Sequence, residues 1–248
     1  MNLIVDTGNS RTKIALFKEN TLVQKAWVDD ENDVRLFINH QKVKNIIYSR
    51  VGNNTNSFNE YLNQLAPVHY FSYRSKLPFI NLYKTQETLG GDRMAVIAGA
   101  ILKFKNKNVL IIDAGTCITY DFVNENSEYH GGAISLGLEM RFKALNTFTK
   151  SLPFIEPQPN FNQLIGDTTK NSILSGVQLG ILAEVKDQIQ AYLALYPDLQ
   201  VLICGGDHSF FDTSLKNSIF ANLIETAPDL VLHGLNSLLQ IQDDYSAA

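Results

Sequence analysis

The chain has 248 residues, 45% of them hydrophobic and 19% charged, with a formal net charge of −4, which fits one large domain or two small ones with a sizeable core. The acidic balance and the scattered lysines and arginines argue against nucleic-acid binding, and no stretch approaches the ~20 apolar residues of a membrane span. The N-terminus enters a predicted strand at once, so we expect no secretory signal. The two cysteines form no C-x-x-C pair, and we expect a cytoplasmic protein with reduced thiols.

The first half of the chain alternates between strand and helix patterns. Three strands joined by short turns are predicted first, and helices then alternate with single strands. The predicted elements are strands at 3–5, 13–17 and 22–27, a helix at 33–40, a strand at 43–48, a helix at 58–65, a strand at 68–71 and a helix at 91–104. A short polar joint at residues 103–108 follows and is the candidate domain boundary.

The second half begins with the same order of elements. The predicted elements are strands at 109–112, 117–123 and 129–134, a helix at 138–148, a loop with three prolines at 151–162, a helix at 169–192, a strand at 199–204 and helices at 208–216 and 229–241. Three strands before a helix thus occur twice. We therefore predict a mixed α/β fold with two related domains, residues 1–106 and 107–248.

Two acidic-glycine turns, each closing a predicted strand, are the main functional signal. They read D-T-G-N at residues 6–9 and D-A-G-T at residues 113–116. Glycine lets the backbone approach a phosphate closely, successive N–H groups form an anion-binding nest, and an aspartate can serve a hydrated metal. Each turn alone is also compatible with an ordinary hairpin. Occurring twice, the turns predict a nucleotide triphosphate held between two halves, with Lys13 on the following strand reaching a phosphate.

A third motif, G-G-D-R at residues 90–93, directly precedes a predicted helix. Asp92 is compatible with two roles, the N-cap of that helix or a general base that takes a proton from a hydroxyl. Arg93 can bind an anionic group bidentately, and Tyr83 is either a wall of the same pocket or a surface residue. C-G-G-D at residues 204–207 suits nucleotide contact at a helix start, or a plain turn capped by Asp207. The five histidines do not cluster, so a zinc site is not favoured.

The ordered motifs resemble those of type III pantothenate kinase, a member of the acetate kinase, sugar kinase, Hsp70 and actin superfamily. They are D-T-G-N-x-x-x-K, G-G-D-R, D-A-G-T-x-x-T-x-D, G-G-A-I-x-x-G and C-G-G-D, from Asp6 to Asp207. The resemblance implies two related ribonuclease H-like (actin-like ATPase) domains with mixed sheets and an ATP cleft between them. The implied activity is ATP-dependent phosphorylation of pantothenate to 4′-phosphopantothenate, an alcohol-accepting phosphotransfer that is the first step of coenzyme A biosynthesis.

The resemblance also implies roles for individual residues. Asp92 matches the catalytic general base, Asp6 would face a hydrated magnesium ion, and Asp113 would help to hold a monovalent cation, potassium or ammonium. The matching ATP-binding positions are Asp6, Thr7, Gly8, Asn9, Ser10, Arg11, Thr12, Lys13 and Thr116. The matching pantothenate-binding positions are Tyr83, Gly90, Gly91, Asp92 and Arg93.

The family is dimeric, and Thr169 matches a threonine that reaches the substrate of the neighbouring subunit, so we expect a homodimer. This chain departs from the family pattern at Leu136, where proline is usual, and at Cys117, where alanine is frequent. Two other functions stay open on the residues alone. One is a kinase of another small polyol such as a sugar, and the other is a non-catalytic regulatory protein related to transcription accessory factors.

Overall fold

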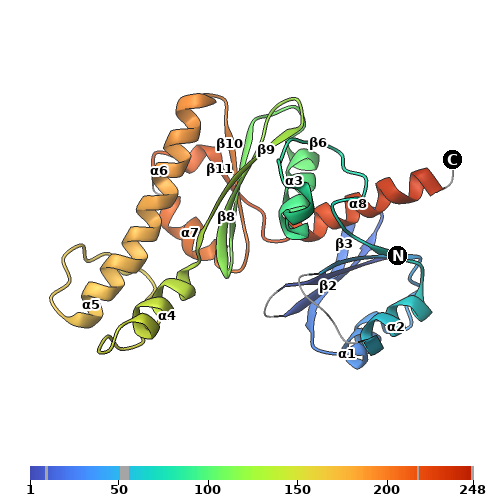
Figure 1. Ribbon diagram of the computed structural model, residues 1–248, viewed down its shortest axis with the longest axis horizontal. Helices are drawn as coiled ribbons and strands as arrows, with labels where there is room; N and C mark the ends of the chain where they lie inside the picture. The colour runs from blue at the N-terminus through green and yellow to red at the C-terminus, as the bar shows by residue number, and fades with distance from the viewer. Residues whose placement is uncertain (9–10, 51–55, 217, 247–248) are drawn as a thin grey trace. The chain divides into compact units, whose positions relative to one another are not determined.

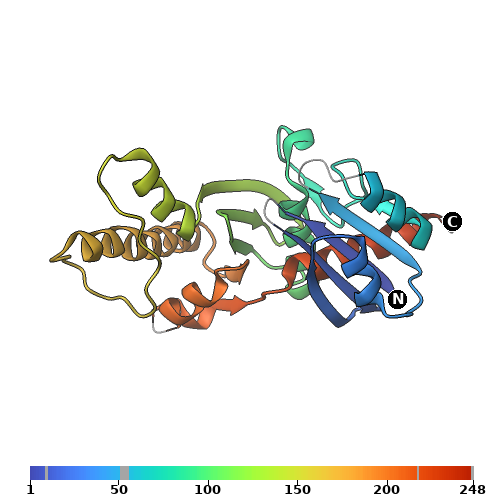
Figure 2. The same ribbon diagram turned by 90° about the horizontal axis from the view of Figure 1, so that it is seen from below.

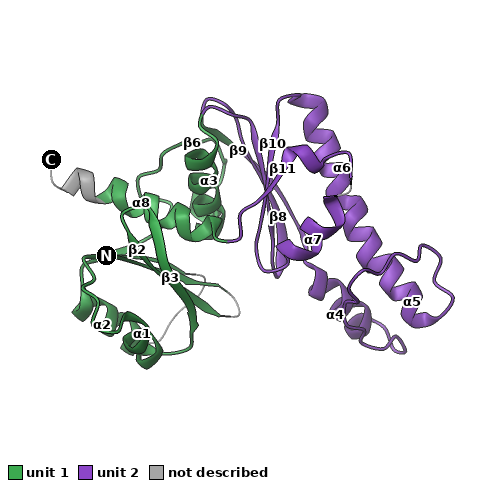
Figure 3. Cartoon of the chain, turned by 180° about the vertical axis from the view of Figure 1, so that it is seen from behind, with its two compact units in different colours: residues 1–105, 127–129, 229–248 green, residues 106–126, 130–228 purple. Residues whose placement is uncertain are grey.

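The computed structural model describes residues 1–8, 11–50, 56–216 and 218–246 and divides into two compact units (Figure 1, Figure 3). Unit 1 comprises residues 1–105, 127–129 and 229–248, and unit 2 comprises residues 106–126 and 130–228. The domain limits expected from the sequence, 1–106 and 107–248, stay a prediction. No helix within the described ranges is long and apolar enough to cross a membrane.

Unit 1 is built on a five-stranded mixed sheet with the order β3-β2-β1-β4-β5. Its strands are β1 (Asn2–Thr7), β2 (Thr12–Lys18), β3 (Thr21–Val28), β4 (Asn45–Arg50) and β5 (Val68–Tyr70). The central strand β1 runs antiparallel to β2 and parallel to β4. The carboxyl end of β1 therefore lies beside the start of β2 and the carboxyl end of β4.

Helices cover both faces of this sheet (Figure 1, Figure 2). Alternate residues such as Leu3, Val5 and Leu16 form a core with α1 (Glu31–Ile38) and α2 (Asn56–Leu65), because side chains alternate between the faces of a strand. The opposite face meets α8 (Leu230–Ser246). There the ring of Phe17 packs edge-on against His233, with 5.2 Å between the ring centroids.

The close crossing of α8 with α3 (Gly91–Lys103) depends on glycine. A Cβ atom on Gly234 would lie 1.8 Å from the carbonyl oxygen of Ala95, and one on Gly99 would lie 2.7 Å from the carbonyl oxygen of Leu230. Both neighbours are backbone atoms that cannot rotate away. The two helices can therefore approach at this distance only because these positions carry no side chain.

Gly234→Ala is expected to destabilise unit 1 by about 1–3 kcal/mol, because the added methyl group must push α8 away from α3. Gly180→Ala is the matched control: Gly180 is also helical, but a Cβ there meets nothing within 4 Å. That substitution should be neutral or stabilising, since alanine favours a helix. Urea denaturation of the two variants checks the difference, and equal stability of both would contradict the tight crossing.

Unit 2 contains a sheet with the same strand order as unit 1. Its strands are β7 (Val109–Ala114), β8 (Cys117–Val123), β9 (Glu128–Leu136), β10 (Gln200–Cys204) and β11 (Ile224–Thr226). The order β9-β8-β7-β10-β11 corresponds to β3-β2-β1-β4-β5, with β7 again antiparallel to the next strand and parallel to β10. The duplication predicted from the sequence is therefore present in the sheets. The first two residues of β9, Glu128 and Tyr129, belong to unit 1, where they pair in parallel with the two-residue strand β6 (Ile80–Asn81).

Four helices contribute to one hydrophobic core with the strands of unit 2 (Figure 3). They are α4 (Leu138–Phe148), α5 (Thr169–Leu174), α6 (Gly180–Leu195) and α7 (His208–Leu215). A π-helical turn, Ser175–Leu179, joins α5 to α6. Within that turn the amide of the Gln178 side chain accepts from the backbone N–H of Gln158 at 2.8 Å and donates to its carbonyl at 2.9 Å. This pair ties the proline-containing loop to the helix.

Several elements differ from the sequence-based expectations. The helix predicted at 33–40 begins earlier, at Glu31, because the Asp30 side chain accepts hydrogen bonds from the N–H groups of Asn32 and Asp33, and it ends before Asn39, which has a positive φ of 43°. The helix predicted at 169–192 is interrupted by the π-helical turn and runs to Leu195. The short strands β6 and β11, and the 3₁₀ turns Gln86–Thr88 and Ala221–Leu223, were not predicted.

Candidate active site

Asp6 occupies the central strand of unit 1, between two polar residues of the neighbouring strands. The register places Lys13 of β2 opposite Asp6 on one side and Ser49 of β4 opposite it on the other. Ser49 is only 3% exposed, and its hydroxyl makes a hydrogen bond with the Asp6 carboxylate. The strand pairing therefore gives the Asp6 carboxylate a cation and a hydroxyl as neighbours.

The electrostatic environment of Asp6 is unusual. Burial and, next, the nearby Asp92 carboxylate raise the pKa of Asp6 to about 6, while Lys13 and the Ser49 hydrogen bond oppose the shift. The effect of Asp92 shows that the first acidic turn and the G-G-D-R motif come together within unit 1. A site with two neighbouring carboxylates is suited to a divalent cation and to proton transfer.

The G-G-D-R motif forms the start of α3. Gly90 is the N-cap, with an extended backbone (φ −60°, ψ 142°), so Asp92 is not the N-cap residue, contrary to one of the two roles left open for it. Asp92 lies in the first turn, where its Oδ1 accepts a hydrogen bond from the backbone N–H of Arg93 at 2.8 Å. A Cβ on Gly91 would lie 3.0 Å from the Ser49 hydroxyl oxygen. The helix N-terminus, which favours negative charge, thus adjoins the end of β4.

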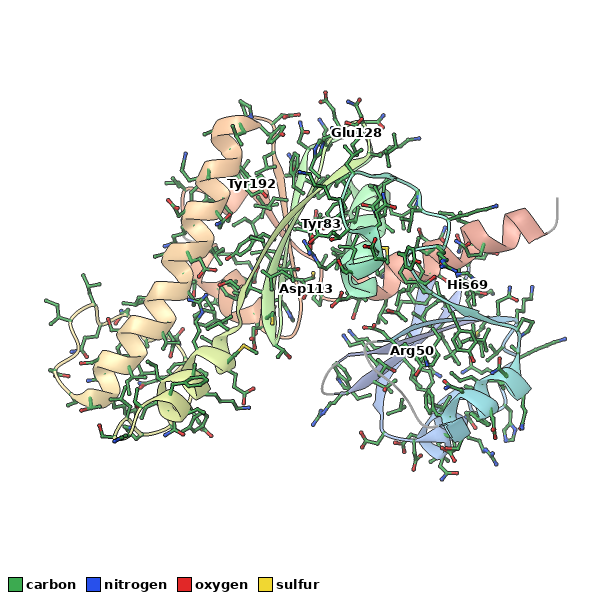
Figure 4. The ribbon with its side chains drawn as sticks, in the orientation of Figure 1. Arg50, His69, Tyr83, Asp113, Glu128 and Tyr192 are labelled. Atoms are coloured by element: carbon green, nitrogen blue, oxygen red, sulfur yellow. The ribbon has the colours of Figure 1, made fainter. Side chains whose placement is uncertain are left out.

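Arg93 and Tyr83 also come together in unit 1. The Arg93 side chain is 7% exposed, and its guanidinium carbon lies 5.6 Å from the centroid of the Tyr83 ring. Tyr83 is half-buried and lies next to α3 (Figure 4). Tyr83 and Arg93 therefore contact each other, and the role of Tyr83 as the wall of a pocket stays a prediction.

The first acidic-glycine turn is a closed hairpin. The N–H of Gly8 donates to the carbonyl of Arg11 at 3.1 Å, and the hydroxyls of Thr7 and Thr12 are 3.1 Å apart. Asn9 and Ser10, two of the expected ATP-binding residues, lie outside the described residues. On the adjacent strand the Lys13 ammonium lies 4.8 Å from the ring centroid of Trp27, the cross-strand partner of Lys13.

In unit 2, Asp113 takes the place that Asp6 has in unit 1 (Figure 4). Its cross-strand partners are Thr119 on β8 and Cys204 on β10. The turn that follows closes with a hydrogen bond from the N–H of Gly115 to the carbonyl of Cys117 at 3.0 Å. The second turn is therefore one residue shorter than the first, and its strand neighbours are neutral.

Two helix N-termini pack closely against the second turn. The N–H of Gly137, the N-cap of α4, donates to the carbonyl of Thr116 at 3.1 Å, and a Cβ on Gly137 would lie 2.3 Å from that oxygen. Gly205, with φ +88°, lies so close to Ala114 that a Cβ would be 2.3 Å from its carbonyl oxygen. Both glycines are therefore required for the close approach of the backbone, and Leu136 in place of proline leaves it intact.

Asp207 lies at the start of α7, beside the same turn. Its N–H donates to the carbonyl of Ala114 at 2.9 Å. It occupies the N-cap position, as expected, but its side chain makes no capping hydrogen bond. Burial and the nearby Glu139 raise the pKa of its carboxyl group. Asp207 also lines a cavity of about 390 Å³ in unit 2, whose other lining residues include Leu138, Pro159, Gln178 and Phe210.

Thr169 is the first residue of α5, in unit 2. It lines a hollow of about 730 Å³ with Gly166, Thr168 and Ser172 among other residues. The preceding Thr168 is the N-cap and accepts a hydrogen bond from the N–H of Asn171 at 3.1 Å. The threonine singled out from the sequence is therefore presented at a helix start, on a surface of unit 2.

The sequence reasoning missed Ser49. Its importance comes from the parallel register of β4 with β1, which pairs residues more than forty positions apart. A signal was present: Ser49 is a polar residue near the carboxyl end of an apolar strand, as Asp6 is in β1. Within the described ranges, no group of three or more His, Cys, Asp or Glu residues could hold a metal ion. Neither Cys117 nor Cys204 forms a disulfide bond.

Solved structures with similar folds include two with low sequence identity. One is named as a conserved Baf family transcriptional activator from Campylobacter jejuni; it is 20% identical, with a TM-score of 0.63, and covers 98% of this chain and 99% of that chain. The other is component A of the (R)-2-hydroxyglutaryl-CoA dehydratase of Acidaminococcus fermentans, 13% identical, with a TM-score of 0.55 and coverage of 100% and 99%. Together with the two mixed sheets, these likenesses confirm the predicted actin-like fold class.

At the level of sequence, the family model and the curated relatives agree with each other. The family model for type III pantothenate kinase matches residues 2–191. A type III pantothenate kinase of Christiangramia forsetii is 43% identical over 244 residues, which covers 97% of this chain and 98% of the relative. One of Flavobacterium psychrophilum is 40% identical over 249 residues, with coverage of 98% and 100%. The chain therefore belongs to the type III pantothenate kinase family.

Proposed function

We propose that this protein transfers the γ-phosphoryl group of ATP to the primary hydroxyl of pantothenate, giving 4′-phosphopantothenate, the first step of coenzyme A biosynthesis. The observation that carries this proposal is that the start of α3, which holds Asp92, adjoins Ser49, the strand partner of Asp6, in a chain that belongs to this family. Phosphoryl transfer needs mainly positioning and charge neutralisation. Lys13 and the N-terminus of α3 supply positive charge, and the carboxylates can hold a metal cation that neutralises more.

In this proposal Asp92 is the general base. Its carboxylate accepts the proton of the pantothenate hydroxyl as that oxygen attacks the γ-phosphorus. In this proposal Oδ2 accepts the proton, since the hydrogen bond from the Arg93 N–H falls on Oδ1. Arg93 and Tyr83, with the backbone of Gly90 and Gly91, bind pantothenate, and the arginine pairs with its anionic group.

ATP is bound, in the same proposal, by both acidic-glycine turns. The ATP-binding residues of this proposal are residues 6–13 of the first turn and Thr116 of the second. Asp6 holds a magnesium ion through water; such an ion neutralises phosphate charge during transfer. Its site fits, because Asp6 already has a second carboxylate nearby and carboxylate oxygens are the ligands that magnesium prefers.

A coupled assay with ATP, magnesium and potassium tests the proposal directly. The acceptors are pantothenate and a panel of sugars and other small polyols. Turnover with pantothenate alone supports the proposal. Turnover with a sugar but not with pantothenate would favour another polyol kinase, and no turnover with any acceptor would favour the non-catalytic regulatory alternative.

Potassium or ammonium should activate the enzyme more than sodium, because we propose that Asp113 helps to hold a monovalent cation. The assay is repeated in potassium, ammonium and sodium chloride at equal ionic strength. Asp113→Asn should raise the potassium concentration needed for half-maximal rate. Equal rates of the unaltered protein in all three salts would remove this role of Asp113.

We also propose a homodimer in which Thr169 reaches the substrate of the partner subunit. Supporting this, Phe148, Leu164 and Ile165, on α4 and on the loop before α5, are largely exposed apolar residues, and such surfaces are typical of interaction sites. Thr169 lines a hollow in the same region of unit 2. Sedimentation of the purified protein measures the oligomeric state. The cytoplasm, as the expected location, stays a prediction.

A further inference from the structure

We infer that Tyr129 is a positioning residue for pantothenate binding, acting through Tyr83. The two rings lie nearly parallel, at an angle of 22° and with 6.0 Å between their centroids. Tyr129 is fully buried, so its ring does not itself offer a surface to a small molecule. Tyr83 is half-buried and contacts the Arg93 guanidinium. The inference rests on the proposed function, which assigns Tyr83 and Arg93 to pantothenate.

The backbone of this region explains why the two rings meet. Strand β6 pairs in parallel with the start of β9, which places Asn81 opposite Tyr129. The N–H of Leu82 then donates to the carbonyl of Tyr129 at 3.0 Å, and the N–H of Tyr83 donates to the Asn81 side-chain oxygen at 3.0 Å. Strand β6 thus fixes the backbone at Asn81, opposite Tyr129, and Tyr83 follows two residues later.

The side chain of Tyr129 is in turn held on a second side. The ring of Phe79 packs edge-on against it, with 6.2 Å between centroids and an interplanar angle of 72°. Phe79 is also buried. Tyr129 is therefore the central ring of three, with the outer position taken by the ring that lies beside Arg93. Stacked aromatic pairs of this kind restrict the orientation of the exposed partner.

The consequence for binding is a lower entropic cost. A Tyr83 ring that is already held in one orientation, with the Arg93 guanidinium beside it, does not have to be immobilised when pantothenate binds. Without the flat face of Tyr129, Tyr83 can rotate, and part of the binding free energy is used to order it. The effect should appear in the KM for pantothenate and much less in kcat or in the KM for ATP.

A double-mutant cycle with steady-state kinetics tests this inference. Tyr129→Leu should raise the KM for pantothenate by about two- to tenfold, the range expected for an aromatic pair, whereas Tyr129→Phe, which keeps the ring, should change it less than twofold. In the Tyr83→Ala background the further change Tyr129→Leu should have no additional effect. Phe79→Leu is the control, because it removes a buried ring of the same cluster that has no such stack with Tyr83.

The outcomes separate the inference from the proposed function. No phosphorylation of pantothenate by the unaltered protein would overturn the proposed function itself. An active protein in which Tyr129→Leu leaves the KM for pantothenate unchanged, or raises it equally in the Tyr83→Ala background, would overturn the inference alone. An equal rise in Phe79→Leu would do the same, since it would indicate general loosening. If Tyr129→Leu does not fold, Tyr129→Met, whose flexible side chain adapts to the space without a flat face, takes its place in the cycle.

Discussion

Asp92→Asn is expected to lower turnover of pantothenate by about 10²- to 10⁴-fold, the range typical of a lost general base. The amide keeps the size of the carboxylate and can still accept the hydrogen bond from the Arg93 N–H. It cannot take the proton of the attacking hydroxyl. The start of α3 should therefore keep its structure while the chemical step is lost, and steady-state turnover with saturating ATP and pantothenate measures this directly.

Nucleotide binding by the same variant should stay within about threefold of the unaltered protein, a free-energy change below ~1 kcal/mol. The single tryptophan, Trp27, is 56% exposed and lies beside Lys13, so its fluorescence can follow a non-hydrolysable ATP analogue at the first turn. Glu87→Gln, an exposed change five residues earlier, is the matched control with normal turnover. Near-normal turnover of Asp92→Asn would show that Asp92 is not the base.

Asp6→Asn should abolish activity yet make the ligand-free protein more stable at neutral pH. The pKa of Asp6 is about 6 in the folded protein, against a usual value of 3.8. At a pH between these two values, the folded state therefore still binds a proton that the unfolded state has lost. The free energy of unfolding therefore falls as the pH rises through this window, and it stays lower above it. The asparagine amide carries no charge, so the free energy of unfolding of the variant does not fall with pH in this way. The difference from the unaltered protein is at most ~3 kcal/mol.

Urea unfolding between pH 4 and 8, without magnesium or nucleotide, measures the gain. Trp27 lies in unit 1 with Asp6, so its emission follows the relevant unit. Near pH 4 the variant and the unaltered protein should have similar stability, and the gap should open by pH 6 and then remain constant. Lys13→Met should act in the opposite direction, because Lys13 lowers the pKa of Asp6. A gap that does not depend on pH would contradict the assigned burial of this carboxylate.

The sequence predicted what depends on local pattern. Both strand–turn–strand units, the start of α3 at Gly91 and the bounds of α4 follow from short-range alternation and from glycine. The acidic-glycine turns and the G-G-D-R motif that contains Asp92 could be recognised because each is a short continuous segment of sequence. The bringing together of Asp6 and Asp92 was expected only through a family resemblance, since 85 residues separate them.

What the sequence could not predict depends on pairing between distant segments. The role of Ser49 arises from the register of β4 with β1. Strand β6 has two residues, too few for any periodicity, and exists because β9 offers it partners. The packing of α8 in unit 1 was also not predictable, because the apolar face of a helix does not indicate which sheet it packs against.

The position of α8 in the chain has a consequence for biosynthesis. The helix supplies buried leucines, including Leu232, Leu235 and Leu239, to a unit whose other residues lie mainly before residue 106. During translation, the face of the unit 1 sheet that α8 covers therefore stays exposed until more than a hundred further residues have been added. The later-encoded unit 2 can close first, and an exposed apolar nascent segment of this kind is a natural client for chaperones.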